Sequence, residues 1–427
     1  MKKITQFVLI VLCLTIACVS FGCLSVNSNI RMSVSTSLNN VSYEFESSNH
    51  YRALDKDFIA RLNNAQVKLY ELLSKNENSN YCVSPVSIYM ALSLLDFIGD
   101  DKVKEEVGEL LGLSQDDILL SNEVFEYLIR NVTSGDKTGV VNMTNSVWVD
   151  EEETPIEETL KDLAEKYYCY AYKTPFKTNN AKANKDIKNF VKKKTEGLID
   201  QDFDLKSDTV FALINTLYFK DNWVHDGDAL ETRTDDFTTT TGKVSTEFLV
   251  GKYYTGKIAS DELSDAFYTK THHGFSIYFV MPKDGVSLKD VMTVEHISSV
   301  NKSINYSLNN DYHASTRVIF PSFELENDTK AKDIIKENGY LTHTFKSFKS
   351  TLLEDEVLVS EIKHSATLKV DKKGIKGAAV TVIGFAKSLD GEPREEFYDF
   401  LVNKEFGFYI TVGDVIIFMG QVTNPSK

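Results

Sequence analysis

One segment near the C-terminal end of this 427-residue chain constrains the fold more than any other. It runs from Lys372 to Leu389 and reads KKGIKGAAVTVIGFAKSL. Just before it, apolar side chains between His364 and Val370 alternate with the two-residue period of a strand that buries one face. After Gly374 the apolar residues move from even to odd positions, as happens across a hairpin turn. The sequence therefore predicts two adjacent strands joined by a turn near Gly374.

The second of these strands contains unusually small side chains. Gly377, Ala378 and Ala379 follow one another, whereas strands that lie permanently in a sheet usually carry larger residues. A plain hairpin at the edge of a sheet is one interpretation of this pattern. The other is a strand that enters the sheet only when the protein changes conformation.

Composition and charge narrow the class of protein. The chain is 42% hydrophobic and 26% charged, which is typical of a soluble globular protein. Its net charge of −15 argues against nucleic acid or an anionic membrane surface as a general partner, because no basic field attracts phosphates. Cys82 and Cys169 lie in apolar surroundings, so we expect buried thiols and no disulfide. No Cys/His spacing supports a metal site.

Residues 1–22 have the features of a secretory signal peptide. A basic start precedes the apolar stretch 4–17, and a small residue then precedes a cysteine. The site before Cys23 is similar to a bacterial lipoprotein cleavage site, at which the cysteine becomes lipidated. Cys18 is the alternative lipidation site.

The Ser- and Asn-rich stretch 23–53 is predicted to be a flexible tether. One acylated cysteine would anchor the mature protein to a membrane without spanning it. We therefore expect an extracellular protein held at the cell surface through a lipid, or otherwise secreted. Residues 54–427 contain no linker that divides them and are predicted to form one domain.

Helices are predicted early in this domain and strands late. Apolar residues at spacings of three and four predict a helix between Phe58 and Leu72, and Ser84 followed by Pro85 starts a second, strongly apolar helix. Strands are predicted from β-branched and aromatic content at Val147–Val149, Val210–Phe219, Phe275–Met281, Arg317–Phe323 and Phe408–Val422. This order favours an α+β fold with large antiparallel sheets over a doubly wound fold.

Enzyme motifs are missing from the sequence. It has no G-x-S-x-G, no H-E-x-x-H, no complete phosphate loop and no dinucleotide-binding fingerprint. The adjacent His272 and His273 would point to opposite faces of a strand, and His364 has no evident nucleophile partner. We therefore predict a protein that is not an enzyme and that needs no cofactor.

Separated sequence blocks carry a resemblance to one family. They are Asn80–Ile88 (NYCVSPVSI), Asn189–Ile199, Thr209–Trp223 (TVFALINTLYFKDNW), Val359–Val370 and Phe406–Pro425, which ends FMGQVTNP. In this order they resemble the serpins, the serine protease inhibitor superfamily, over residues 54–427. Because the signal peptide is of the lipoprotein type, we expect this serpin to come from a bacterium or an archaeon.

The resemblance implies an α+β fold of three β-sheets and eight or nine helices with an exposed reactive-centre loop. It also implies a suicide mechanism, in which a serine (or cysteine) protease cleaves the loop and forms a covalent acyl-enzyme complex with the inhibitor. The loop then inserts into the central sheet and traps the protease. The partner implied is the target protease, and the protein is expected to be a monomer. The alternative is a non-inhibitory serpin that acts as a binding or carrier protein.

By residue-by-residue resemblance, Trp223 corresponds to the tryptophan at the entrance to the sheet, called the breach. The hinge of the loop corresponds to Lys372, Lys373, Gly374, Ile375, Lys376, Gly377, Ala378, Ala379, Val380 and Thr381. Residues implied to form a hydrogen-bonded clasp behind the sheet, called the shutter, are Ser84, Ser87, Asn215 and His364. The reactive bond is Ser388–Leu389 by the family's loop length, and Lys387–Ser388 is the alternative. The span from the reactive bond to Phe406, which contains the acidic and aromatic stretch 390–400, is longer than is typical of the family.

Overall fold

The computed structural model describes residues 36–38, 54–132, 139–223, 229–253, 257–309, 316–359, 362–376 and 398–426. Several predicted features lie outside these residues. They are the signal peptide (1–22), Cys18, Cys23, the hinge residues Gly377–Thr381 and the reactive bond at Ser388–Leu389 or Lys387–Ser388.

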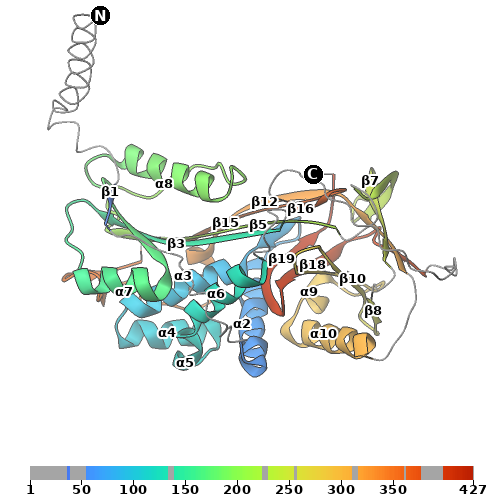
Figure 1. Ribbon diagram of the computed structural model, residues 1–427, viewed down its shortest axis with the longest axis horizontal. Helices are drawn as coiled ribbons and strands as arrows, with labels where there is room; N and C mark the ends of the chain where they lie inside the picture. Colours follow the sequence, from blue (N-terminus) through green and yellow to red (C-terminus); the bar gives the residue numbers. More distant parts are fainter. Residues whose placement is uncertain are drawn as a thin grey trace, which may run out of the picture.

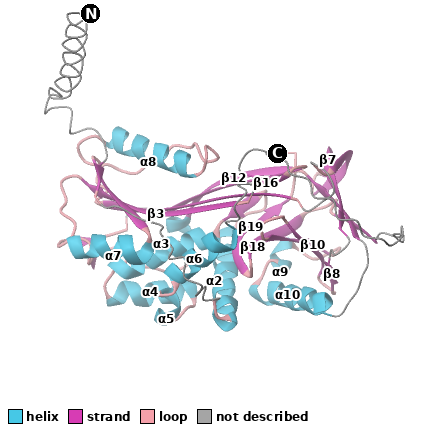
Figure 2. Cartoon of the chain, in the orientation of Figure 1, coloured by secondary structure: helices cyan, strands magenta, loops and turns pink. Residues whose placement is uncertain are grey.

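Most helices of the described chain lie on one side of a long sheet, while α8 covers the opposite side (Figures 1 and 2). The helices are α2 (Lys56–Ser74), α3 (Pro85–Ile98), α4 (Asp101–Leu111), α5 (Gln115–Ile118), α6 (Ser121–Val132), α7 (Glu157–Tyr167), α8 (Asn180–Lys194), α9 (Leu288–Val291), α10 (Val294–Asn309) and α11 (Ala331–Glu337). Helix α3 begins as the sequence predicts, because the Ser84 side chain caps it and Pro85 needs no N–H partner there.

Sheet A is the largest sheet, with seven described strands. In spatial order these are β1 (Thr36–Ser37), β4 (Cys169–Thr174), β3 (Val140–Asp150), β5 (Phe211–Asn222), β16 (Gly374–Lys376), β15 (Lys363–Asp371) and β12 (Phe323–Lys330). Neighbouring strands pair antiparallel, except that β3 and β4 run parallel.

Two further large sheets pack beside sheet A. Sheet B has the order β2 (Tyr81–Val83), β19 (Val415–Val422), β18 (Phe406–Val412), β10 (Phe275–Pro282), β9 (Ser264–Lys270) and β8 (Lys257–Ser260). Sheet C has the order β17 (Tyr398–Leu401), β11 (Thr316–Pro321), β7 (Gly242–Tyr253) and β6 (Glu231–Thr239). A small ribbon pairs β13 (Phe348–Lys349) with β14 (Glu356–Val357). The predicted α+β class with three main sheets is confirmed for the described residues.

Two hydrophobic clusters hold these layers together. The larger cluster joins α2, α3, sheet B and the inner face of sheet A. The smaller one lies between α8 and the outer face of sheet A and includes Trp148, Phe176, Ile187 and Val191. Helix α8 is therefore attached to sheet A through its own apolar contacts. Cys82 and Cys169 are buried free thiols, as predicted.

Part of the predicted tether forms a strand. Thr36 and Ser37 pair with β4 at the edge of sheet A, and the Leu38 N–H donates to the Ala171 carbonyl at 2.8 Å. The prediction of a flexible tether over 23–53 is therefore wrong for residues 36–38. The unpaired edge of β4 offers backbone donors and acceptors that a passing extended segment can satisfy.

The hinge corrects a second expectation. The family resemblance implies that the chain beyond Gly374 joins the sheet only after loop cleavage. In the intact chain, however, β16 already pairs with β15, as the hairpin predicted near Gly374 requires, and also with β5. Ile375 is fully buried there. Burying an isoleucine side chain stabilises this arrangement by about 2 kcal/mol, which a serine or threonine at the same position would not provide.

Replacing Ile375 by Asp should expel β16 from sheet A, because a carboxylate at this buried position loses its hydration. We expect hydrogen–deuterium exchange of the amides that pair β15 with β16 to accelerate by about tenfold or more. Lys372→Asp, in the exposed turn, is the matched control and should leave exchange unchanged. Equal protection in both variants would show that Ile375 does not hold the hinge in the sheet.

Candidate functional site

The candidate site is the space between β5 and β15. It extends from β16, which pairs with the C-terminal end of β5, toward the N-terminal end of β5. In the part of the chain that the structure describes, these strands are joined only through the three residues of β16. Between them lies a cavity of about 110 Å³, lined on one side by α3 and on the other by the end of α8 and the chain after it. Sheet A is therefore open along most of the length of β5 and β15.

Three of the four predicted shutter residues form one hydrogen-bonded cluster at this cavity. The Ser84 N–H donates to Nε2 of His364 at 2.9 Å. The Ser84 hydroxyl donates to the Ile417 carbonyl at 2.8 Å and lies 2.9 Å from the Ser87 hydroxyl. The cluster thus ties the start of α3 to β15 and to sheet B.

The fourth predicted shutter residue, Asn215, lines the same cavity but is bonded elsewhere. Its amide donates to Asn145 Oδ1 at 2.7 Å, and the Asn145 amide donates to the Tyr167 carbonyl at 2.9 Å. The expected four-residue clasp is therefore wrong for Asn215 in this open sheet. Asn215 Oδ1 is a buried acceptor that has no hydrogen-bond partner among the described residues. Such an atom costs about 1–3 kcal/mol, so a donor that entered the cavity would be favoured.

The environment of His364 fixes its protonation state. Burial lowers the pKa of His364 to about 4, because the charged imidazolium loses its hydration. The neutral ring can accept the Ser84 N–H, whereas the protonated ring has no acceptor nitrogen. Near neutral pH, His364 is therefore neutral and accepts the hydrogen bond that links β15 to the start of α3.

Trp223 lies at the entrance to sheet A, as the sequence predicts for the breach. Its indole N–H donates to the Asp371 carbonyl at 2.8 Å, and its backbone N–H donates to the Lys373 carbonyl at 3.2 Å. The Leu230 N–H donates to the Lys372 carbonyl at 2.8 Å. These bonds hold the turn between β15 and β16 against the end of β5.

One functional candidate was missed by sequence reasoning. Asp221, at the end of β5, has a buried carboxylate that contacts His273 in the turn between β9 and β10. The two residues are 52 positions apart, so no local pattern links them. The only signal in the sequence is the adjacent pair His272 and His273, which a strand would direct to opposite faces.

A serine, a histidine and an aspartate also meet elsewhere, in sheet B. Ser264 Oγ lies 2.8 Å from His296 Nε2, and His296 Nδ1 lies 3.8 Å from Asp261. Ser264 is 1% exposed, and its N–H donates to Asp261 Oδ1 at 2.9 Å. A serine nucleophile must reach its substrate, and the buried Ser264 cannot. These hydrogen bonds are best explained as contacts that fix the turn before β9.

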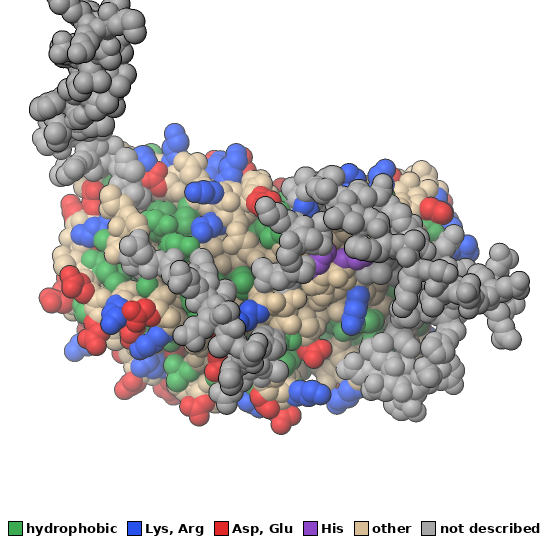
Figure 3. All heavy atoms as spheres, in the orientation of Figure 1, with side chains coloured by type: hydrophobic (Ala, Val, Ile, Leu, Met, Phe, Trp, Pro, Cys, Tyr) green, Lys and Arg blue, Asp and Glu red, His purple; other side chains and the backbone are tan. Residues whose placement is uncertain are grey.

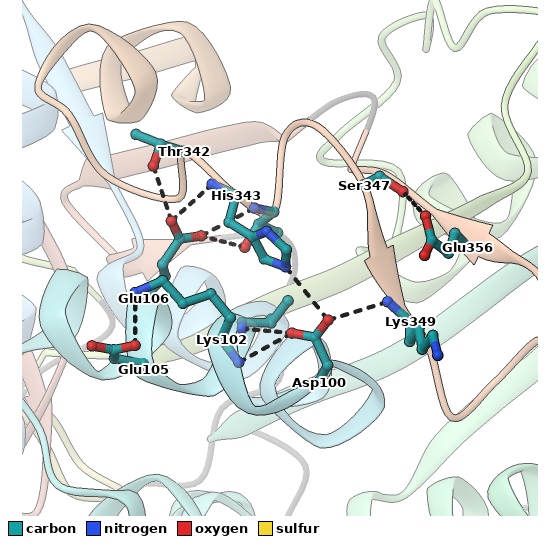
Figure 4. Close-up of polar contacts among 11 residues, drawn as sticks. Asp100, Lys102, Glu105, Glu106, Thr342, His343, Ser347, Lys349 and Glu356 are labelled. Carbon is teal, nitrogen blue, oxygen red and sulfur yellow. Dashed lines mark hydrogen bonds and ion pairs between the residues drawn. The ribbon is translucent and has the colours of Figure 1, made fainter.

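A second polar cluster fixes the chain that leads into β15 (Figure 4). The Glu106 carboxylate accepts the N–H groups and hydroxyls that Thr342, His343 and Thr344 supply. Burial alone would raise the pKa of Glu106, but these hydrogen bonds outweigh it and hold the pKa below its usual value. Asp100 caps α4 and also accepts the Lys349 N–H. This cluster therefore anchors the segment before β15 to α4.

Other site classes gain no support from the described residues. No group of three or more His, Cys, Asp or Glu side chains there could hold a metal ion. No helix among them is long and apolar enough to cross a membrane. On the face shown in Figure 3, acidic and basic side chains are interspersed and do not gather by sign.

Comparisons with known proteins agree with this geometry. A family model described as "Serpin (serine protease inhibitor)" matches residues 60–425. An uncharacterized serpin-like protein of Thermococcus kodakarensis is 27% identical over 421 residues, covering 95% of this chain and 96% of that protein. The crystal structure of tengpin, a thermophilic serpin in its native state, has a TM-score of 0.74 and 22% identity, covering 92% of this chain and 100% of that one. Thyroxine-binding globulin in complex with thyroxine has a TM-score of 0.70 and 21% identity, covering 87% and 100%.

Because the family model covers most of the chain, the protein belongs to the serpin family. The two solved structures confirm the serpin fold. The family includes both protease inhibitors and non-inhibitory binding proteins.

His364 should make stability depend on pH in a defined direction. Its pKa is about 4 in the folded protein and near 6.5 when unfolded, so its contribution is complete above pH 6.5 and is lost as the pH falls toward 4. We expect the free energy of unfolding to fall by about 2 kcal/mol more for the wild type than for His364→Gln between pH 7.5 and pH 5. Urea denaturation at the two pH values measures this difference. A wild-type-minus-variant difference that stays constant with pH would contradict the assignment of a neutral His364.

Proposed function

We propose that the protein is an inhibitory serpin that traps serine-type, or cysteine-type, proteases outside the cell. A target protease cleaves the reactive loop and becomes covalently linked to it as an acyl-enzyme. The loop then inserts between β5 and β15 as a new strand, before water can release the protease. The observation that carries this proposal is the open sheet with the hinge already paired at its entrance.

The register of β16 supports insertion at the residue level. Ile375 pairs with Val370 of β15 and with Asp221 of β5. Continuing each ladder residue by residue brings Thr381 opposite His364 on one side and opposite Asn215 on the other. Directly opposite residues share a face of the sheet. Both registers therefore carry the Thr381 hydroxyl toward the shutter, where the unpaired Asn215 Oδ1 could accept its hydrogen.

The same registers give a reason for the small hinge residues. Gly377 would lie between Phe219 and Leu368, which are large and buried. Ala379 would lie between Leu217 and Ala366. Because a sheet interior is close-packed, larger side chains at Gly377 and Ala379 would obstruct the incoming strand. The hinge sequence is thus compatible with rapid insertion.

We assign the reactive bond to Ser388–Leu389, with Lys387–Ser388 as the alternative. From Ile375 to Ser388 a fully inserted strand would extend ~40 Å along sheet A. A protease held at Ser388 would thus be carried from the hinge end of β15 toward its opposite end. Distortion of the acylated protease during this movement is what we propose to prevent deacylation.

We also propose that the protein is located at the cell surface and is a monomer. Cys23, or alternatively Cys18, would carry a lipid that anchors a monomer to the cell surface, and the protein would otherwise be secreted. A host that is a bacterium or an archaeon fits this signal. The pairing of residues 36–38 with β4 would leave at most 12 residues between Cys23 and sheet A, or ~40 Å of extended chain.

The alternative is a non-inhibitory binding or carrier protein. Thyroxine-binding globulin, which has the same fold, was solved with thyroxine bound. The small, uncharged hinge residues Gly377–Thr381 and the open sheet favour the inhibitory function. A carrier would be cleaved in its loop by proteases without retaining them.

Incubation of the protein with subtilisin-, elastase-, chymotrypsin- and trypsin-like proteases tests the proposal directly. We expect an SDS-stable complex with at least one class, and mass spectrometry of the released C-terminal fragment will identify the reactive bond. Thr381→Glu should abolish the complex and leave only the cleaved form, because its carboxylate would have to enter the buried shutter.

Thr381→Ser is the matched control, because it keeps the hydroxyl, adds no charge and should still allow trapping. Cleavage without any complex by all four proteases would contradict an inhibitory function toward these classes. A complex formed equally by Thr381→Glu would contradict the proposed register.

A further inference from the structure

Asp221 connects the entrance of sheet A to sheet B. Its side chain is fully buried, and Oδ2 accepts the backbone N–H of His273 at 2.7 Å. Nδ1 of His273 lies 2.7 Å from Oδ1, which also accepts the Asn222 N–H at 2.8 Å. Because His273 lies in the turn between β9 and β10, this contact attaches the end of β5 to sheet B.

The backbone of Asp221 also pairs with the hinge strand β16. Ile375 pairs with Asp221, and Gly374 pairs with Asn222. The approach is close, since a Cβ added to Gly374 would lie 2.0 Å from the Asp221 carbonyl oxygen. The position of Asp221 therefore decides whether β16 fits between β5 and β15.

We propose that the Asp221–His273 pair is a positioning clamp that holds the end of β5 one strand width away from β15 and so keeps the hinge docked. This inference rests on the proposed inhibitory function. With the hinge docked, insertion only has to extend an existing strand. Without the clamp, β5 can move toward β15 and expel β16. Insertion must then start anew, while water competes to hydrolyse the acyl-enzyme.

The charges around the clamp make it sensitive to pH. The ring of His272 lies 6.2 Å from that of His273. The other charged residues next to the pair along the backbone are Lys220, which precedes Asp221 on β5, and Asp371, Lys372 and Lys373 in the turn that leads into β16. A protonated His273 forms an ion pair with Asp221 in a site with little water. A neutral His273 keeps the hydrogen bond but loses this opposite charge. The clamp should therefore be tighter at acidic pH than at alkaline pH.

The test measures how many inhibitor molecules are consumed per protease molecule trapped, using a protease that forms the complex with the wild type. We expect this ratio to rise about fivefold in Asp221→Asn and in His273→Gln at pH 6. In the wild type the ratio should rise as the pH increases from about 5.5 to 8, and His273→Gln should abolish this dependence. His272→Gln, a change at the exposed neighbouring histidine, is the control and should behave as the wild type.

A ratio in Asp221→Asn equal to that of the wild type would overturn the clamp, and so would a pH profile that His273→Gln leaves intact. Hydrogen exchange of the β16 amides provides a readout without a protease. We expect Asp221→Asn to lose their protection while His272→Gln retains it. If the wild type traps no protease, the proposed function fails, and the exchange result still decides whether the clamp holds the hinge.

Discussion

The pairing of β16 between β5 and β15 is the contact on which the rest of this structure depends. Three residues separate the two strands by the width of a strand, and beyond them no described strand lies between β5 and β15. Open strand edges leave backbone donors and acceptors without ladder partners, which is a cost that a further strand would remove. In the proposed mechanism, the open sheet would therefore supply part of the driving force for insertion.

The rest of the molecule holds this open sheet in place. The shutter cluster fixes α3 to β15 through Ser84 and His364, and Glu106 fixes the segment that precedes β15. Asp221 and Trp223 fix the entrance. These contacts hold the surroundings of the opening in place. Among the described residues, β5 pairs with β3 and β15 with β12, while their facing edges have no ladder partner beyond β16.

Much of this could be predicted from the sequence, because alternating apolar residues and local caps are local signals. The strand ending at Val370, the helix starting at Pro85 and the buried thiols were all predicted correctly. The β1 strand and the pairing of β16 with β5 were not. Both depend on free strand edges, at β4 and between β5 and β15, that only the tertiary structure reveals. The bond of Asn215 to Asn145 and the contact of Asp221 with His273 were missed for the same reason, since each joins residues distant in sequence.

The melting temperature before and after cleavage of the reactive loop tests the central claim most directly. If sheet A is open to receive the loop, the cleaved loop fills the cavity, satisfies the edges of β5 and β15 and raises the melting temperature. A cleaved protein that melts at the same temperature as the intact one would show that the strand does not insert. That result would contradict the claim that the space between β5 and β15 is a site for the incoming loop.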